Sequence, residues 1–541
     1  GLIPLAMTSG AGALGNKSIA TTAIGGMIVG TIVGVVVIPG LFVLFASMKK
    51  NRITKKIKVG AATAVILAIS LLSSCAVQKD VDLTHRPLPE HFVGSDKADT
   101  LTKDTTSIAN ISWREFFQDE NLVRLIDTAL KNNPDMQQAL YRVEMARANM
   151  RLRKNALFPS VDAVAEAGLR KYGFYTIDGI GNYDTNFSGN LKDDEKLPDP
   201  VPDYFLGLRA SWEIDVWGKL KNRKKAAFAR FLSSYEGRKL VQTQLVAEVA
   251  TAYFDLLALD NELAILEKNI VLQQESYELV QVQKAGGRAT ELGVQQMRAI
   301  LANSKSRKEV VLQQINSKEN YLNFLCGRFS NKIERGENTL EDYPLASAAK
   351  VGLPIRMLTL RPDIRAAELN LLAAKGDVKA ARAAFMPSLQ FSPYVGFQAF
   401  DMSKLFVTPS SIAYGLIGGL TAPLFNQRLI RSAYEQELAN KGIEYQEYEK
   451  TVLKAWQEVE TGLNAQKHIM RRRQLNNEEV EALRLAVDAS TELFKAGRAN
   501  YLDVITSQRN VLDAEISLNS TYLEYLQSVI NLYRSLGGGW E

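Results

Sequence analysis

The segment LRPDIRAAE (residues 360–368) decides the fold of this chain, because it repeats an earlier pattern, NNPDMQQA (132–139). The two Pro-Asp pairs are separated by an offset of 228 in the numbering, and Pro159-Ser160 and Pro387-Ser388 keep the same offset. An internal repeat of this length means that one set of structural elements is used twice. We therefore predict two tandem repeats, joined by a linker at 331–355. The repeats are residues 111–330 and 356–541.

The repeat continues toward the end of the chain with a shorter offset. Gly287-Arg288-Ala289 aligns with Gly497-Arg498-Ala499 at an offset of 210, so a short stretch of the first repeat has no counterpart in the second. The difference falls between Ser160 and Trp217, where residues 172–203 are rich in Gly, Asp, Asn and Pro. These residue types favour turns. We predict the same order of elements in both repeats, with a longer loop in the first.

Each repeat contains two stretches that alternate between apolar and polar residues, which is the period of a β-strand. The stretches are 160–169 and 206–216 in the first repeat, and 388–398 and 412–424 in the second. Strands of about 10–12 residues with one apolar face suit a transmembrane β-barrel, although a soluble sandwich also alternates. Four strands cannot close a barrel, and an open sheet edge is not tolerated in lipid. Membrane strands therefore require that several copies assemble.

The remainder of each repeat has the pattern of a long helical hairpin. Residues 219–284 contain no Pro, and their apolar residues follow a heptad spacing from Leu245 to Ile270. A helix of about 65 residues is roughly 100 Å long. Residues 427–495 are its counterpart. A Gly-containing turn follows each helix, KAGGRAT (284–290) or KAGRAN (495–500), and a second helix returns. Two such hairpins predict a coiled-coil tube rather than a globule.

Composition excludes several classes of function. The chain has 541 residues, which is too long for one ordinary compact core. Its net charge is +6. Residues 1–74 hold seven Lys or Arg and no Asp or Glu, so the rest carries a net charge of −1 and gives nucleic-acid binding no support. Two Cys and three His exclude a disulfide framework and a His-rich metal centre. No catalytic constellation occurs, so we expect neither an enzyme, nor a metal, nor a cofactor.

The N-terminal region contains two apolar segments of different kinds. Residues 19–45 carry no charge and are long enough to span a bilayer. Residues 48–74 have a basic start and a short apolar stretch, and end in Leu-Ser-Ser before Cys75. They resemble a bacterial lipoprotein signal peptide, which implies cleavage before Cys75 and a covalent lipid on its sulfur. The alternative is a second transmembrane helix that ends in a buried Cys.

Residues 1–47 resemble the C-terminal end of an antiporter of the resistance–nodulation–division (RND) type. The stretch GAGALGNKSIATTAIGGM (10–27) carries this resemblance and is more like hydrophobic-drug pumps than metal pumps. We interpret residues 1–47 as a fusion or a gene-calling artefact that indicates the neighbouring gene. Residues 75–110 then form an extension between the lipidated Cys and the first repeat.

Motifs along the rest of the chain resemble the TolC/OprM family of outer-membrane efflux channels. They are NNPDMQQA, LFPS (157–160), GLP (352–354), LRPDIRAAE, FMPSL (385–389) and the two Gly turns. The resemblance implies a mixed α and β membrane protein: a homotrimer with a 12-stranded transmembrane barrel, four strands from each chain, continued by a periplasmic coiled-coil tunnel. It also implies two partners, a periplasmic adaptor and an RND-type inner-membrane antiporter that supplies the energy.

The resemblance further implies roles for residues at the tunnel tip. In the family, acidic residues narrow the closed tip, and Asp503 matches one such position. Thr506 stands where several relatives have a second acidic residue, which puts a double acidic ring in doubt. Relatives dock the adaptor on the Gly turns. The corresponding residues here are Lys284, Gly286, Gly287 and Arg288 in one turn, and Lys495, Gly497 and Arg498 in the other. The alternative reading is ordinary helix capping.

The function expected from these features is a passive outer-membrane duct for amphiphilic drugs or other small toxic compounds. The alternatives are an exit duct for another cargo, a diffusion porin and a structural tether across the periplasm. A porin needs only short periplasmic turns, and a tether would not need four amphipathic strands.

Overall fold

The computed structural model describes residues 111–336, 358–423 and 427–540, together with Pro89, Ile108, Leu340 and Tyr343. The chain divides into two units, 1–80 and 81–541, and every described residue belongs to the second. The antiporter-like segment 1–47, the signal-like segment 48–74 and Cys75 lie outside the described residues, as does most of the predicted linker. Within the described ranges, no helix combines the length and the apolar character needed to cross a membrane.

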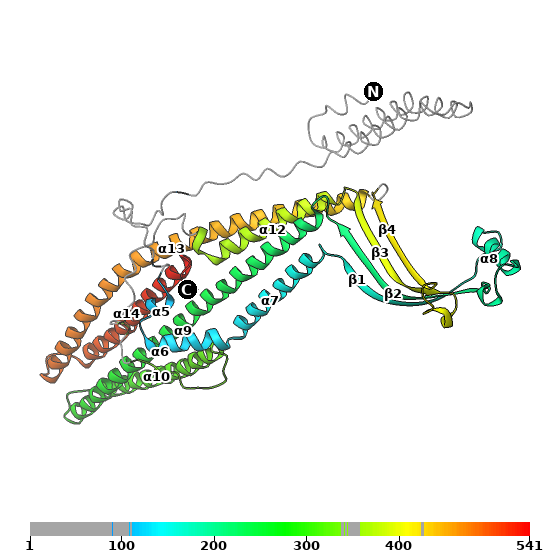
Figure 1. Cartoon of the computed structure of the whole chain (residues 1–541). Helices are drawn as coiled ribbons and strands as arrows, with labels where there is room; N and C mark the ends of the chain where they lie inside the picture. The colour runs from blue at the N-terminus through cyan, green and yellow to red at the C-terminus, as the bar shows by residue number, and fades with distance from the viewer. Residues whose placement is uncertain are drawn as a thin grey trace, which may run out of the picture. The chain divides into compact units, whose positions relative to one another are not determined.

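The same order of helix, two strands and long helical hairpin occurs twice (Figure 1). The first half contains α5 (Trp113–Phe116), α6 (Glu120–Asn132), α7 (Pro134–Asn155), β1 (Ser160–Arg170), α8 (Ile177–Phe187), η3 (Asp193–Glu195), β2 (Val201–Ile214), α9 (Lys219–Ala285) and α10 (Glu291–Leu325). The second contains α12 (Pro362–Ala383), β3 (Ser388–Ala399), η4 (Met402–Lys404), β4 (Ile412–Thr421), α13 (Gln427–Lys495) and α14 (Tyr501–Ser535).

The Pro-Asp motifs begin helices. Pro134 and Pro362 stand in the first turns of α7 and α12, where a missing N–H costs nothing, and an Asp follows each at the positive end of the helix. Pro159 and Pro387 lie at the corners between these helices and the strands that follow.

Contacts around the two motifs correspond at the offsets read from the sequence. The Asn133 side chain donates to the Leu325 carbonyl at 2.9 Å, and its counterpart in the second motif, Arg361, donates to the Ser535 carbonyl at 2.7 Å. Gly327 and Gly537, which correspond at the shorter offset, both have positive φ. A Cβ at either glycine would lie under 3.0 Å from the backbone just before the helix motif of its own half. In both halves, the end of the second long helix therefore packs against the start of the Pro-Asp helix through a side-chain hydrogen bond and a glycine.

The four strands form one antiparallel sheet in the order β1-β2-β3-β4. The register aligns Leu208 with Val395 and Val395 with Tyr414, so apolar side chains of neighbouring strands share one face. That face is not covered, since these three residues are 48%, 52% and 80% exposed. The predicted strands are confirmed. Among the described residues, the outer strands β1 and β4 each pair on one side only.

Residues 172–203 differ from the predicted loop. They contain the helix α8, and β2 begins at Val201, earlier than expected. The helix forms because the Thr176 hydroxyl caps it, accepting from the Gly179 N–H at 3.0 Å. Its apolar side chains, Ile177, Ile180, Tyr183 and Phe187, follow a helical spacing. The abundance of Gly and Asn had masked that spacing.

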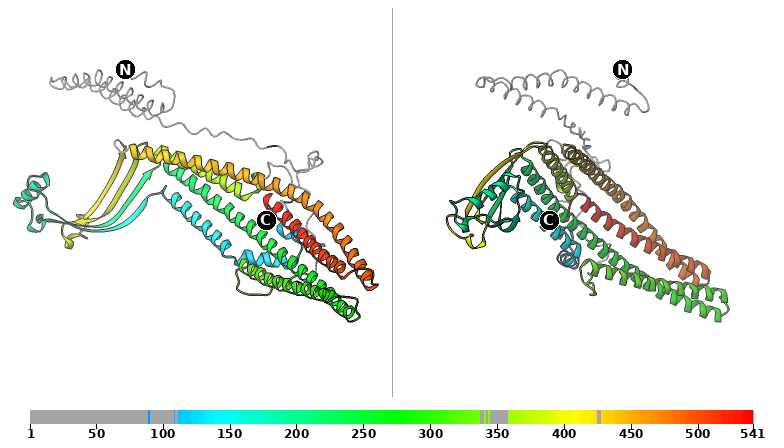
Figure 2. Two further views of the ribbon diagram at one scale, coloured as in Figure 1. Left: turned by 180° about the vertical axis from the view of Figure 1, so that it is seen from behind. Right: turned by 90° about the vertical axis from the view of Figure 1, so that its right-hand side faces the viewer.

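The long helices run alongside one another in the order α10, α9, α14, α13 (Figure 2). Helices α9 and α13 match their predicted bounds to within one residue. Most of the predicted heptad seam on α9 lies in the core: Leu245, Val249, Ala252, Leu256 and Leu266 are all buried. Cys326 is completely buried at the end of α10, as expected for an apolar residue, and burial raises the pKa of its thiol.

Candidate functional site at the hairpin tips

The turn between α9 and α10 is a Schellman motif that requires glycine at one position. The Gly287 N–H donates to the Lys284 carbonyl at 2.9 Å, and the Arg288 N–H donates to the Gln283 carbonyl at 2.8 Å. Gly287 has φ +74°, which favours glycine, whereas Gly286 has an ordinary φ of −82°. A Cβ at Gly287 would meet no atom within 4 Å, so the turn presents open backbone.

The turn between α13 and α14 has the same geometry. Gly497 has φ +71°, and the Arg498 N–H donates to the Leu493 carbonyl at 2.8 Å. Ala496 stands where the first turn has Gly286. An alanine is tolerated there because the φ of Gly286 lies in the ordinary range. The predicted tip residues therefore occupy equivalent places in two matched turns. Capping explains their local conformation, and the exposed backbone leaves room for a partner.

Ion pairs with described residues neutralise the tip lysines but not the tip arginines. Lys284 pairs with Glu291, and its hydrogen bond lowers the pKa of that carboxyl. Lys495 pairs with Glu492 at 2.8 Å, and that hydrogen bond raises the pKa of the lysine. Arg288 and Arg498 are exposed and form no ion pair with any residue that the structure describes. Each tip therefore offers one free guanidinium to a partner.

Asp503 and Thr506 lie on the first turns of α14, next to the second turn. The Asp503 carboxylate accepts from the Asn500 N–H at 2.9 Å and completes a capping box. The Thr506 hydroxyl donates to the Leu502 carbonyl at 2.8 Å. Both side chains are exposed in the single chain. Capping gives Asp503 a structural task without burying its charge, and its role in a gate stays a prediction.

An apolar cluster just above the turns joins the two hairpins and was missed from the sequence. Its buried members are Val280, Val294, Met297, Phe494, Val504 and Ile505, which come from all four long helices. The Tyr501 ring lies over Gly293, where a Cβ would be 3.1 Å from the ring. Gly293 is the counterpart of Asp503 at the shorter offset of the repeat. Gly293 was the one sequence signal of this contact, because a residue without a side chain leaves space for an aromatic ring.

Replacing Tyr501 with alanine should loosen the two hairpins at the tip. The variant loses an aromatic contact in the apolar cluster, which is worth about 1–3 kcal/mol for a partly buried ring. We expect several-fold faster trypsin cleavage after Arg288 and Arg498, measured by mass spectrometry on the purified protein. Leu502→Ala is the matched control, since Leu502 is 50% exposed and outside the cluster. Equal cleavage of both variants would contradict the coupling.

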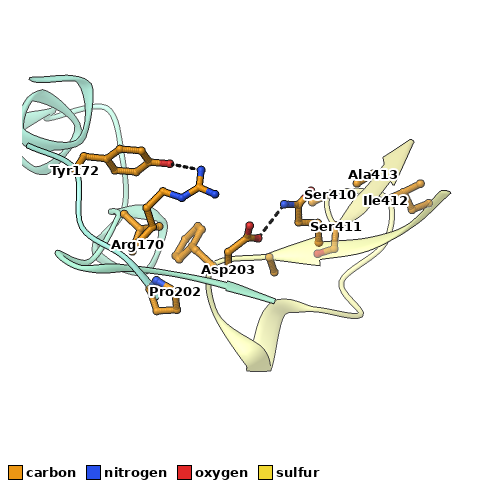
Figure 3. Close-up of a pocket in the computed structure, with 12 residues that line it drawn as sticks. Arg170, Tyr172, Pro202, Asp203, Ser410, Ser411, Ile412 and Ala413 are labelled. Carbon is orange, nitrogen blue, oxygen red and sulfur yellow. Dashed lines mark hydrogen bonds between the residues drawn. The ribbon is translucent and has the colours of Figure 1, made fainter. Parts of the chain in front are cut away.

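A hollow of about 380 Å³ lies at the loop end of the sheet (Figure 3). Arg170 and Asp203 line it from β1 and β2, and Ser411 lines it from the start of β4. The Gln398 side chain donates to Asp203 at 2.8 Å, and Arg170 contacts the Tyr172 hydroxyl at 3.4 Å. The hollow is open and has the charged side chains of Arg170 and Asp203 in a partly apolar lining, so water can enter it.

Within the described ranges, no three His, Cys, Asp or Glu side chains lie close enough together to hold a metal ion. The covalent lipid predicted on Cys75 falls outside those ranges and stays a prediction.

Comparisons with known proteins agree with this geometry. The family described as outer membrane efflux protein matches residues 125–328 and 353–538. The toluene efflux pump outer membrane protein TtgF of Pseudomonas putida is 29% identical over 488 residues, covering 88% of this chain and 96% of that protein. The cation efflux system protein CusC of Escherichia coli O157:H7 is 28% identical over 475 residues, covering 87% and 97%. A crystal structure of CusC superposes with a TM-score of 0.73 at 26% identity, covering 86% of this chain and all of that one.

The family match covers well over half of the chain and includes both hairpins and all four strands. The chain belongs to the outer membrane efflux protein family, a family of outer-membrane channels and not of enzymes.

Proposed function

We propose that three copies of this chain close one 12-stranded barrel in the outer membrane. The observation that carries this proposal is the sheet: four antiparallel strands, an uncovered apolar face, and outer strands β1 and β4 that each pair on one side only among the described residues. An open edge is not tolerated in lipid, so β1 of one copy pairs with β4 of the next. The barrel places the apolar face against lipid and the polar face toward the lumen.

The helical hairpins of the three copies then line a tunnel in the periplasm. The outer helices of each chain still expose apolar side chains that such a wall would cover. On α7, for example, Tyr141, Met145 and Leu152 share one stripe and are 73%, 69% and 59% exposed. The matched contacts at Asn133 and Arg361 support the further inference that the chain consists of two tandem structural repeats.

The mechanism is conduction rather than chemistry. An RND-type antiporter in the inner membrane supplies the energy, and a periplasmic adaptor joins it to the tunnel tip. The adaptor binds the two turns, where it contacts their open backbone and the guanidinium groups of Arg288 and Arg498. Asp503, with Thr506 one turn further on, narrows the closed tip, and a lipid on Cys75 anchors the chain in the outer membrane.

The cargo that we propose is amphiphilic drugs or other small toxic compounds. The antiporter-like segment 1–47 supports this class, and so does the likeness to a toluene efflux protein. The likeness to a cation efflux protein keeps another exported cargo as the alternative. A passive diffusion porin is less well supported, because it would have no use for two helical hairpins of this length.

Export of an amphiphilic dye tests this function. The chain is expressed from Met48 in cells that lack their own outer-membrane channels, with or without the pump and adaptor. We expect lower dye accumulation only when all three proteins are present. Arg498→Glu should weaken adaptor docking by at least about tenfold, because it replaces an attraction with a repulsion, and should restore accumulation. Arg509→Glu is the control, because Arg509 lies on α14 away from the turn. Dye loss without the pump would instead indicate a porin.

A further inference from the structure

The polar face of the sheet carries an ion pair stacked on an aromatic ring. Arg209 on β2 donates from Nη1 and Nη2 to the two carboxylate oxygens of Glu166 on β1, at 2.5 and 2.6 Å. The guanidinium carbon of Arg209 lies 4.7 Å from the centre of the Phe205 ring. A bidentate pair of this kind has a fixed geometry, and the ring adds a cation–π contact beneath it. The pair is therefore held at a defined place on the face.

Glycines beneath the ring set its height above the sheet. A Cβ on Gly207 or Gly396 would lie 2.8 or 3.0 Å from the tip of the Phe205 ring. Because these two positions have no side chain, the ring lies flat against the backbone and is only 5% exposed. The Tyr394 ring lies over Gly415 in the same way. The two rings fill the space of missing side chains and do not stand up from the sheet, so the ion pair is the group presented to solvent.

The polar face of the sheet carries more acidic than basic side chains. The register places six charged side chains on the polar face of the four described strands: Asp162, Glu166, Arg170, Asp203, Arg209 and Glu213. Glu213 pairs with Lys219 at the start of α9, at 2.7 Å. The other five sum to −1 for each chain, and Arg209 is one of only two cations among them. The charge of Arg209 therefore decides how negative this surface is.

We infer that Arg209, held by Glu166 and seated on Phe205, sets how negatively charged the passage through the outer membrane is, and that this passage favours cationic and neutral solutes over anionic ones. The inference rests on the proposed barrel, which directs this face toward the lumen. Three copies then give a ring of three such pairs, with three net negative charges around it. Charges in a narrow passage with low-dielectric walls act on every solute that passes. Cationic amphiphiles are thus the cargo that leaves most easily.

Chemical labelling from outside the cell tests this ring without involving the tunnel tip. Ser392 lies on the polar face of β3, beyond Tyr394 as counted from the loop end, and Ser392→Cys provides the target. Two methanethiosulfonate reagents of opposite charge, a trimethylammonium and a sulfonate, are added to intact cells, and both labelling rates are measured. Cys326 is buried and gives no background. We expect the cationic reagent to react faster.

Neutralising either partner should then change the ratio of the two rates in opposite directions. Arg209→Gln should raise the cation-to-anion ratio by roughly fivefold, and Glu166→Gln should lower it by a similar factor, for three charges screened by physiological salt. Phe205→Leu keeps both charges but removes the aromatic ring beneath the ion pair. It should shift the ratio less than Arg209→Gln or Glu166→Gln does. Glu115→Gln changes a charge outside the sheet and should have no effect.

The outcomes separate this inference from the proposed function. If Ser392→Cys is labelled but the ratio of the two rates does not change in the Arg209 and Glu166 variants, the inference is overturned and the proposed duct function still stands. An unreactive Ser392→Cys, with a reactive cysteine at Val395 on the apolar face, would overturn both, because the polar face would not line the lumen.

Discussion

Replacing Arg361 with alanine is expected to destabilise the protein by about 3–5 kcal/mol, the usual cost of removing one partner from a buried ion pair. The Arg361 side chain is only 7% exposed and binds Asp363 at 2.6 Å and Glu458 at 2.9 Å. It also donates to the Ser535 carbonyl, which ties the end of α14 to the start of α12. Burial alone would lower the pKa of Arg361, but the two carboxylates more than offset this and raise it.

The Arg361 prediction is checked by urea unfolding of the detergent-solubilised protein, followed by circular dichroism. Arg365→Ala is the control: Arg365 pairs with Glu368 one turn along the same helix, but both side chains are about half exposed. Its loss should cost under about 1 kcal/mol. A defect as small as that of Arg365→Ala would refute the structural role.

Replacing Leu416 with arginine is expected to abolish assembly in the outer membrane. Leu416 lies in the middle of β4, on the apolar face, and is 75% exposed. An arginine on the lipid face of a barrel costs about 2–4 kcal/mol near the middle of the bilayer, and a trimer would meet that cost three times. Less than a tenth of the wild-type amount of folded protein should reach the outer-membrane fraction, measured by immunoblot.

The neighbouring residue supplies the matched control. Ile417 points to the opposite face, pairing with Ser392, and is 59% exposed. Ile417→Arg should place its charge in the water-filled lumen and assemble at close to the wild-type level. Equal losses in both variants would indicate that neither face meets lipid as proposed.

Much of the fold could be predicted from the sequence, because its signals are local or repeated. Period-two alternation located the strands, the absence of Pro over a long stretch located α9, and the duplicated Pro-Asp motif indicated that one set of elements is used twice. The turn glycines were also readable, because a residue with the left-handed backbone of Gly287 and Gly497 is usually glycine. Each of these signals depends on neighbours in sequence, which one chain displays directly.

The rest depends on contacts between distant segments. Nothing near Arg361 in the sequence indicates Glu458, 97 residues away, as its partner. The contact of Tyr501 with Gly293 likewise requires knowing that the two hairpins lie side by side. The seat of Arg209 requires the strand register, since Phe205, Gly207 and Gly396 share a face only once β2 and β3 are paired. Helix α8 was missed for a different reason, because its composition outweighed its spacing.

Three copies of the chain should complete the wall of one passage, and the mass of the intact assembly shows whether they do. The protein would be extracted from outer membranes in mild detergent and analysed by native mass spectrometry. We expect one species with three times the mass of the mature chain. A folded, membrane-extracted monomer or dimer as the main species would contradict it, because β1 and β4 would then have to close the sheet by some other means.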